Sequence, residues 1–233
     1  MRFISNAVPF LSGLAILLVL AAFSTPALAT TYYVRTDGGP ATQCNGKADA
    51  PASAAPNCAW SSPTVALPMG DGLYGYKAPA ALIKGGDTLV IASGSYMIGY
   101  SDSPIAGTQG QSCGKGSPYE CTITNIPSGI DANHPTVITG ASCSAKPELW
   151  GTERINTIFT LSGLHDVTIA CLELTDHAKC IESYLPTGTA TQGVVACNRN
   201  SYPYGDWAST GISADHVQNL TLRGLNIHGF ANT

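Results

Sequence analysis

Charged residues are scarce in this chain, and their scarcity excludes several classes of protein. Asp, Glu, Lys and Arg make up 11% of the sequence, against about 25% in an average soluble protein. The formal net charge is −4, so no basic surface for nucleic acid or for an anionic membrane is expected. Helical bundles and coiled coils are also disfavoured, because their outer faces need many charges. Gly, Ser, Thr, Asn and Pro take the place of the charges, which is typical of a sheet-rich extracellular protein.

Two further features are missing. None of the eight cysteines forms a Cys-x-x-Cys pair, and no cysteine pair has a matching histidine pair at zinc-finger spacing, which argues against a structural metal site. No second long apolar run follows the first 30 residues. No membrane span is therefore expected once the N-terminal segment is removed.

The N-terminal segment has the three parts of a secretory signal peptide. Arg2 supplies a positive charge, residues 10–23 form an uncharged apolar run, and Ala27-Leu28-Ala29 offers small residues for cleavage. Residues 1–29 are therefore predicted to be removed, so that the mature chain begins at Thr30 and is secreted, periplasmic or displayed at the cell surface. The alternative is an uncleaved membrane anchor.

All eight cysteines lie in the predicted mature chain, and an even number in an exported protein favours disulfides. Short loops hold their ends close together, so local bridges are expected, although eight cysteines allow 105 connectivities. The expected pairs are Cys44–Cys58, Cys113–Cys121 and Cys180–Cys197, with Cys143–Cys171 by elimination.

The mature chain is expected to form one domain with two parts. Residues 30–83 contain an N-terminal strand, Tyr32-Tyr33-Val34, followed by a loop-rich cap that carries the first disulfide. From residue 84 onward, short β-branched runs such as 88–91 and 136–139 alternate with turn residues, which predicts strands. The stretch 101–133 between them has the composition of a loop insertion.

An internal repeat is the most informative feature of the sequence. FTLSGLHDVTIACLELTDHA (159–178) aligns without a gap to ISADHVQNLTLRGLNIHGFA (212–231), at an offset of 212 − 159 = 53 residues. The apolar positions recur with period two, so the repeated units are strands. One such unit cannot bury its apolar face alone and has to stack on its neighbours, as in a solenoid. The offset exceeds one coil of about 20–25 residues, so the segment between the copies contains a loop insertion, an extra coil, or both.

The alternation assigns a face to each side chain of the repeat. Residues expected to point into the core are Val167, Ile169, Leu172, Leu174, Leu220, Leu222, Leu225 and Ile227. Residues expected to point outward are Thr168, Glu173 and Thr175 in the first copy, and Thr221, Asn226 and His228 in the second.

Three segments resemble a known family. They are 32–39 (YYVRTDGG), 83–96 (IKGGDTLVIASGSY) and the two repeat copies. Together they resemble the secreted right-handed parallel β-helix proteins of the pectin-lyase-like superfamily, over most of residues 32–233. The resemblance implies an all-β fold, a right-handed parallel β-helix (β-solenoid) with an N-terminal loop-rich cap, whose first coils occupy residues 84–233.

The same resemblance implies a carbohydrate-active protein. Many members of the family cleave or bind acidic polysaccharides at a groove on the outer strand faces. Its lyases use a Lys or Arg as base, with Ca²⁺ held by Asp or Glu. No matching catalytic motif is present in this sequence, so no catalytic residue is assigned.

Candidate binding residues come from two regions. Glu173, Asn226 and His228 belong to one outward column that is suited to lining a sugar groove, with a solvated polar sheet face as the alternative. Tyr202, Tyr204 and Trp207 lie between the repeat copies, where aromatic rings suit either stacking on sugars or packing of the loop.

Three histidines have an aspartate neighbour: His165, His177 and His216. Carboxylates at stacked corners are potential ligands for Ca²⁺, the one cofactor considered for this sequence, and no cofactor is assigned. The alternative is that these aspartates cap turns.

Two functions are therefore open. The first is a polysaccharide lyase-like enzyme that acts on or binds uronate-containing glycans. The second is a non-catalytic extracellular surface or binding scaffold. Two or more carboxylates with a Lys or Arg on one outward face would favour the enzyme.

The end of the sequence carries a further expectation. It stops at Asn232-Thr233, directly after a repeat unit with a full set of inward apolar residues. Natural solenoid ends are closed by a cap. The sequence is therefore predicted to be a fragment, with more coils beyond Thr233. Leu220, Leu222, Leu225 and Ile227 are expected to lie on a terminal coil with one uncovered face.

Overall fold

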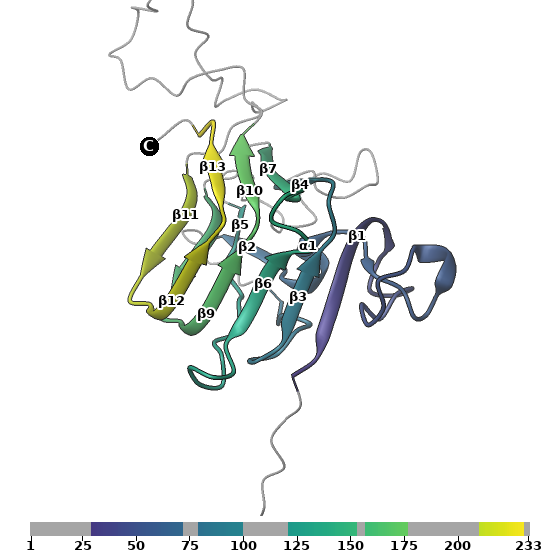
Figure 1. Ribbon diagram of the computed structural model, residues 1–233, viewed down its shortest axis with the longest axis horizontal. Helices are drawn as coiled ribbons and strands as arrows, with labels where there is room; N and C mark the ends of the chain where they lie inside the picture. Colours follow the sequence, from purple (N-terminus) through teal and green to yellow (C-terminus); the bar gives the residue numbers. More distant parts are fainter. Residues whose placement is uncertain (1–28, 72–78, 100–120, 153–156, 177–209, 231–233) are drawn as a thin grey trace, which may run out of the picture.

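The computed structural model describes residues 29–71, 79–99, 121–152, 157–176 and 210–230, and these ranges consist mostly of β-strands and turns (Figure 1). The helices in them are a single 3-10 turn, Ala52–Ala54, and α1, Pro63–Ala66. The strands are β1 (Thr31–Gly39), β2 (Met69–Asp71), β3 (Thr88–Ile91), β4 (Ser95–Gly99), β5 (Cys121–Ile123), β6 (Thr136–Gly140), β7 (Glu148–Thr152), β8 (Thr157–Ser162), β9 (His165–Ala170), β10 (Glu173–Asp176), β11 (Thr210–Asp215), β12 (Gln218–Arg223) and β13 (Asn226–His228).

The strands form three sheets. Sheet A has the order β1-β3-β6-β9-β12, sheet B the order β11-β8-β5-β2, and sheet C the order β13-β10-β7-β4. Every pairing is parallel except the one between β2 and β5. The chain visits sheets A, C and B in turn, so each circuit adds one strand to each sheet. This mostly β, parallel arrangement is compatible with the predicted parallel solenoid.

The two repeat copies stack directly on each other. Phe159 lies opposite Ile212, Val167 opposite Leu220, and Leu174 opposite Ile227, all 53 positions apart as the alignment predicts. β9 is the hydrogen-bonded neighbour of β12, so no additional coil lies between the copies. The offset of 53 residues includes the segment 177–209, which lies outside the described residues.

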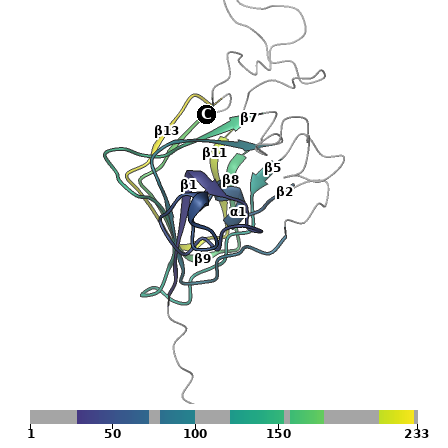
Figure 2. The same cartoon turned by 90° about the vertical axis from the view of Figure 1, so that its right-hand side faces the viewer.

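Figure 2 shows the stacked strands turned by 90°. Alternate side chains of most strands fill the interior between the sheets. Leu89, Ile138 and Ile169 occupy the same register position on β3, β6 and β9, and each is fully buried. In the first repeat copy, the predicted inward residues Leu172 and Leu174 are also fully buried. The period-two pattern therefore identifies the core of this part correctly.

The second copy has the predicted register but not the predicted burial. Leu222 faces the same way as Ile169, and Ile227 the same way as Leu174, yet Leu222 is 46% exposed and Ile227 is 47% exposed. Leu220 and Leu225 are half-buried. In the described part of the chain, β12 and β13 have a strand on one side only, so one face of this coil is uncovered, as was expected.

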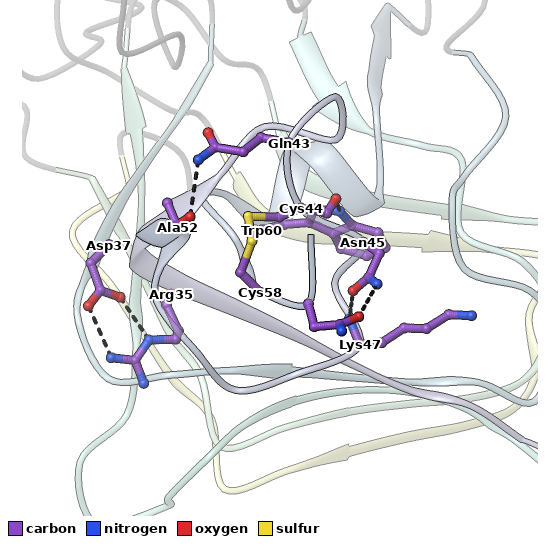
Figure 3. Close-up of a disulfide and its surroundings, with 10 residues drawn as sticks. Arg35, Asp37, Gln43, Cys44, Asn45, Lys47, Ala52, Cys58 and Trp60 are labelled. Atoms are coloured by element: carbon purple, nitrogen blue, oxygen red, sulfur yellow. Dashed lines mark hydrogen bonds and ion pairs between the residues drawn. A yellow bond between two sulfur atoms is a disulfide. The ribbon is translucent and has the colours of Figure 1, made fainter. Parts of the chain in front are cut away.

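The N-terminal strand β1 is the last strand at one end of sheet A, and the loop that follows β1 packs at that end (Figures 1 and 3). The Cys44–Cys58 disulfide spans this loop with a Cα–Cα distance of 4.9 Å. The indole of Trp60 donates to the Cys44 carbonyl oxygen at 2.9 Å and stacks on Tyr32, with ring centroids 5.1 Å apart. These contacts close the β1 end of the core.

The described cysteines pair as the sequence predicts. Besides Cys44–Cys58, a disulfide joins Cys143 to Cys171, with a Cα–Cα distance of 4.5 Å. The predicted pairs Cys113–Cys121 and Cys180–Cys197 involve positions outside the described residues. The signal peptide, residues 1–29, also lies almost wholly outside them.

Sheet B is the part of the fold that the sequence analysis missed. β5 lies within the stretch 101–133 that was interpreted as a loop insertion, and β2 lies within the predicted cap. β5 nevertheless pairs with β8, and β2 pairs with β5. The interpretation of 101–133 as loop is thus wrong for β5.

No helix in the described ranges is long and apolar enough to cross a membrane.

Tyr96 on β4 makes the stability of the core sensitive to alkaline pH. Its side chain is 4% exposed, and its hydroxyl donates to the Ala92 carbonyl oxygen at 2.9 Å. Burial raises the pKa of Tyr96 to about 12 from the ordinary value of 10.0. The unfolded chain therefore loses this proton first. The stabilising contribution of the neutral phenol is complete below pH 10.0 and is lost as the pH rises toward 12.

We expect the Tyr96→Phe variant to reveal this loss. At neutral pH it should be less stable than the wild type by about 1 kcal/mol, because one hydrogen bond is missing. By about pH 11 the wild type should lose about 1.4 kcal/mol relative to the variant, since one pKa unit is worth that amount. Urea unfolding of both proteins at a series of pH values measures the difference. Parallel pH profiles would contradict the assignment.

Candidate functional site

The outer face of sheet C carries two rows of side chains that run across its four strands. Strand alternation turns every second residue away from the core, and the parallel register aligns these residues from strand to strand. The first row is Ser95, Glu148, Glu173 and Asn226. The second row is Met97, Trp150, Thr175 and His228. Thr175 has the outward register that was expected, but it is 3% exposed, so it is covered and not open to solvent. Neighbours within a row lie about 4.8 Å apart, and the two rows lie about 6.6 Å apart, because they are separated by two residues along each strand. A polar row therefore runs beside one that contains an indole.

The predicted residues Glu173, Asn226 and His228 meet at one end of these rows. The Oε1 atom of Glu173 lies 2.7 Å from Nε2 of His228 and accepts from Nδ2 of Asn226 at 3.4 Å. The other ring nitrogen of His228 lies 3.4 Å from Oγ1 of Thr175. The side chain of Glu173 is 30% exposed and that of His228 is 50% exposed. Both groups are therefore held in place and still open to solvent.

A second carboxylate lies on the neighbouring strand. Glu148 of β7 is in register with Glu173 of β10, and Oγ of Ser95 donates to Oε2 of Glu148 at 2.5 Å. Two residues further along β7, the half-buried Trp150 occupies the second row. The middle of the face thus consists of two adjacent glutamates next to an indole.

Glu148, Trp150 and Ser95 were not among the predicted site residues. The signal was present in the sequence, because Glu148-Leu149-Trp150 has the same acidic-leucine pattern as Glu173-Leu174-Thr175, at a spacing of 173 − 148 = 25 residues. That spacing is close to one coil. The alignment at an offset of 53 residues did not detect this coil, because β7 precedes β10 by only 25 residues. The other predicted binding residues, Tyr202, Tyr204 and Trp207, lie outside the described residues.

The aspartate–histidine neighbours form corner contacts. Nδ1 of His165 lies 2.9 Å from Oδ2 of Asp166, and Nδ2 of Asn219 donates to Oδ1 of Asp166 at 2.9 Å. Asp166 and Asn219 both have positive φ, 55° and 52°, and they stack at the corner between sheets B and A. The hydrogen bond from His165, followed by that from Asn219, lowers the pKa of Asp166. This geometry supports the turn-capping interpretation.

The other two aspartate–histidine pairs, at 215–216 and 176–177, add no further cluster of side chains among the described residues. Asp215 and His216 form an exposed pair at 2.8 Å. His177 lies outside the described residues. Among the described residues, no group of three or more His, Cys, Asp or Glu side chains is arranged to hold a metal ion.

The outer face of sheet C combines several polar groups with one aromatic ring. Its carboxylates, amide, imidazole and hydroxyls accept and donate hydrogen bonds, and its indole offers a flat apolar surface. The two rows of sheet C residues described above contain two carboxylates but neither Lys nor Arg.

Compared with known proteins, the chain matches no family model, no curated protein and no solved structure.

Proposed function

We propose that this chain is an exported, right-handed parallel β-helix protein of the pectin-lyase-like type that binds an extracellular polysaccharide on the outer face of sheet C. The observation that carries the proposal is the juxtaposition of Glu148 and Glu173 with Trp150 and His228 in two adjacent rows. Export is supported by the signal-peptide pattern and by two disulfides, which persist in oxidising compartments.

The arrangement of the rows favours an extended ligand. Four strands contribute to each row, so hydrogen-bonding groups recur along the solenoid instead of converging on one point. A polysaccharide presents hydroxyl groups and apolar ring faces in the same repeating manner. Trp150 is suited to stacking on a ring face, while the glutamates are suited to accepting hydrogen bonds from hydroxyl groups.

The charge of the face bears on the class of sugar. Two adjacent carboxylates on this face repel the carboxylates of a uronate polymer. A uronate-containing glycan is therefore best accommodated with a cation such as Ca²⁺ between the two surfaces, whereas a neutral glycan needs none. For cleavage, the Glu173–His228 pair is the acid–base group that the described part of this face offers.

Two substitutions test the binding face. Trp150→Ala should weaken polysaccharide binding about 30-fold, because a stacked tryptophan typically contributes about 2 kcal/mol. Glu173→Gln should weaken it about 10-fold or more, because it removes charge-assisted hydrogen bonds. Thr221→Ala is the matched control, since Thr221 is exposed on the outer face of sheet A. Isothermal titration calorimetry with a panel of neutral glycans and polyuronates, with and without Ca²⁺, measures these affinities.

The same panel separates the candidate functions. A rise in ultraviolet absorbance from unsaturated products would assign a lyase activity, and binding without turnover would assign a binding protein. Loss of affinity in the Thr221→Ala control as large as that in Trp150→Ala would place the site elsewhere. Failure to bind any member of the panel would favour the non-catalytic scaffold.

A further inference from the structure

Asp87 is a buried carboxylate at the start of sheet A. It is 5% exposed and precedes β3 directly. Its Oδ1 atom accepts from the backbone N–H of Thr30 at 2.8 Å, and its Oδ2 atom accepts from the backbone N–H of Lys84 at 2.7 Å. The Lys84 donor is a neutral amide, and the Thr30 donor is also a neutral amide as long as Ala29 is attached to it. Burial of a carboxylate without a cation is costly.

The first donor is the residue at which the mature chain is predicted to begin. Thr30 is held in place by the sheet, because its carbonyl oxygen accepts from the backbone N–H of Thr88 at 2.9 Å, and Thr31 is in register with Thr88. Ala29 is exposed. Its removal therefore leaves the nitrogen of Thr30 in the same place while changing the charge of that nitrogen.

We propose that signal-peptide cleavage creates an ion pair between the α-ammonium group of Thr30 and the carboxylate of Asp87, which stabilises the mature fold. Hydrolysis breaks the C–N bond between Ala29 and Thr30. Water supplies the hydroxyl group to the Ala29 carbonyl and one hydrogen to the Thr30 nitrogen, which then binds a further proton. The inference rests on the export proposal and is independent of sugar binding.

The ion pair has a defined pH range. An α-amino group ordinarily has a pKa of about 7.7–8.0, and pairing with a buried carboxylate raises it. The added stability should be complete below about pH 7.7 and should be lost as the pH rises through the raised pKa. Two other titratable residues lie near Asp87. Tyr32 on β1 has a pKa raised first by burial and then by the charge of Asp87, and Lys84 reaches Asp87 through its backbone N–H.

Chains that differ only at the N-terminus test the proposal. One begins at Thr30, one begins at Ala29, and one begins at Thr30 with an acetylated amine, which keeps the N–H donor but removes the charge. A protease that releases each chain from a fusion partner defines the first residue, so the outcome does not depend on cleavage in the cell. At about pH 6 the free Thr30 chain should melt about 3–6 °C above the other two.

The Asp87→Asn substitution supplies the matched control. In that background the three N-termini should give equal melting temperatures, and at about pH 10 the advantage of free Thr30 should disappear even with Asp87 present. Equal melting temperatures of the free and acetylated chains at pH 6 would overturn the proposal. So would an advantage of free Thr30 that persists in Asp87→Asn. If Asp87→Asn does not fold, the acetylated chain and the pH series decide between the outcomes.

Discussion

Replacing Phe159 by Ala is expected to lower the free energy of unfolding by about 3–5 kcal/mol, because Phe159 is the largest fully buried side chain among the described residues. Phe159 is fully buried on β8, and its register partners are Ile123 on one side and Ile212 on the other. Truncation to Ala leaves a cavity within the stack. The neighbouring strands are held in place by their own ladders and can relax only partly into that space.

Two matched variants separate the cavity from other effects of mutation on β8. Phe159→Leu keeps most of the apolar volume and should be clearly less destabilising than the alanine variant. Ser162→Ala lies on the same strand, at an exposed position, and should change stability by less than about 0.5 kcal/mol. Urea unfolding measures all three variants. A loss below about 1 kcal/mol for Phe159→Ala would contradict the interior position of its ring.

Removal of the Cys44–Cys58 disulfide is expected to cost about 3 kcal/mol. The bridge closes a loop of 14 residues, and the chain-entropy model predicts a loss of that size for a loop of this length. Both cysteines are buried, and the adjacent Trp60 covers the end of the core (Figure 3). The double variant Cys44→Ala/Cys58→Ala should therefore loosen the packing of Trp60 as well as lower the melting temperature.

The second described disulfide provides a comparison. Cys143–Cys171 spans 28 residues, so the chain-entropy model predicts an equal or slightly larger loss for its removal. If local packing around Trp60 dominates, the Cys44/Cys58 variant is the less stable of the two. Lys47→Ser, in the same loop at an exposed position, is the control. Guanidinium unfolding measures stability, and tryptophan fluorescence in a Trp150→Phe/Trp207→Phe background follows the environment of Trp60. Wild-type stability in the Cys44/Cys58 variant would refute a structural role for the bridge.

The site shows how far a sequence pattern reaches. Period-two alternation predicted that Glu173, Asn226 and His228 share an outer face, and the parallel register places them together. It did not indicate that Glu148 and Trp150 belong to the same rows. Their strand β7 lies one coil earlier, and its pairing with β10 depends on the length of the connection between them, which the alternation does not report.

Short strands were the second gap. β2 and β5 contain three residues each, too few for a periodic signal, and β5 is flanked by a stretch with the composition of a loop. β5 is placed in sheet B by pairing with β8, and β2 by pairing with β5, in each case with a strand far along the chain. Strands of this length are stabilised by their partners and not by their own sequence.

The sequence by itself determined which residues are strands in the repeat and which of their side chains face inward, because both depend on nearby residues. It also predicted the local bridge Cys44–Cys58, whereas Cys143–Cys171 followed only by elimination. Only the tertiary structure decided which coils are adjacent and therefore which outward side chains form a row. It also decided which inward residues are covered, since Leu222 and Ile227 have the inward register but remain exposed. The contact between Thr30 and Asp87 is of the same kind. It joins residues 57 positions apart and exists because β1 and β3 pair in parallel, with the residues that precede both strands at one edge of sheet A.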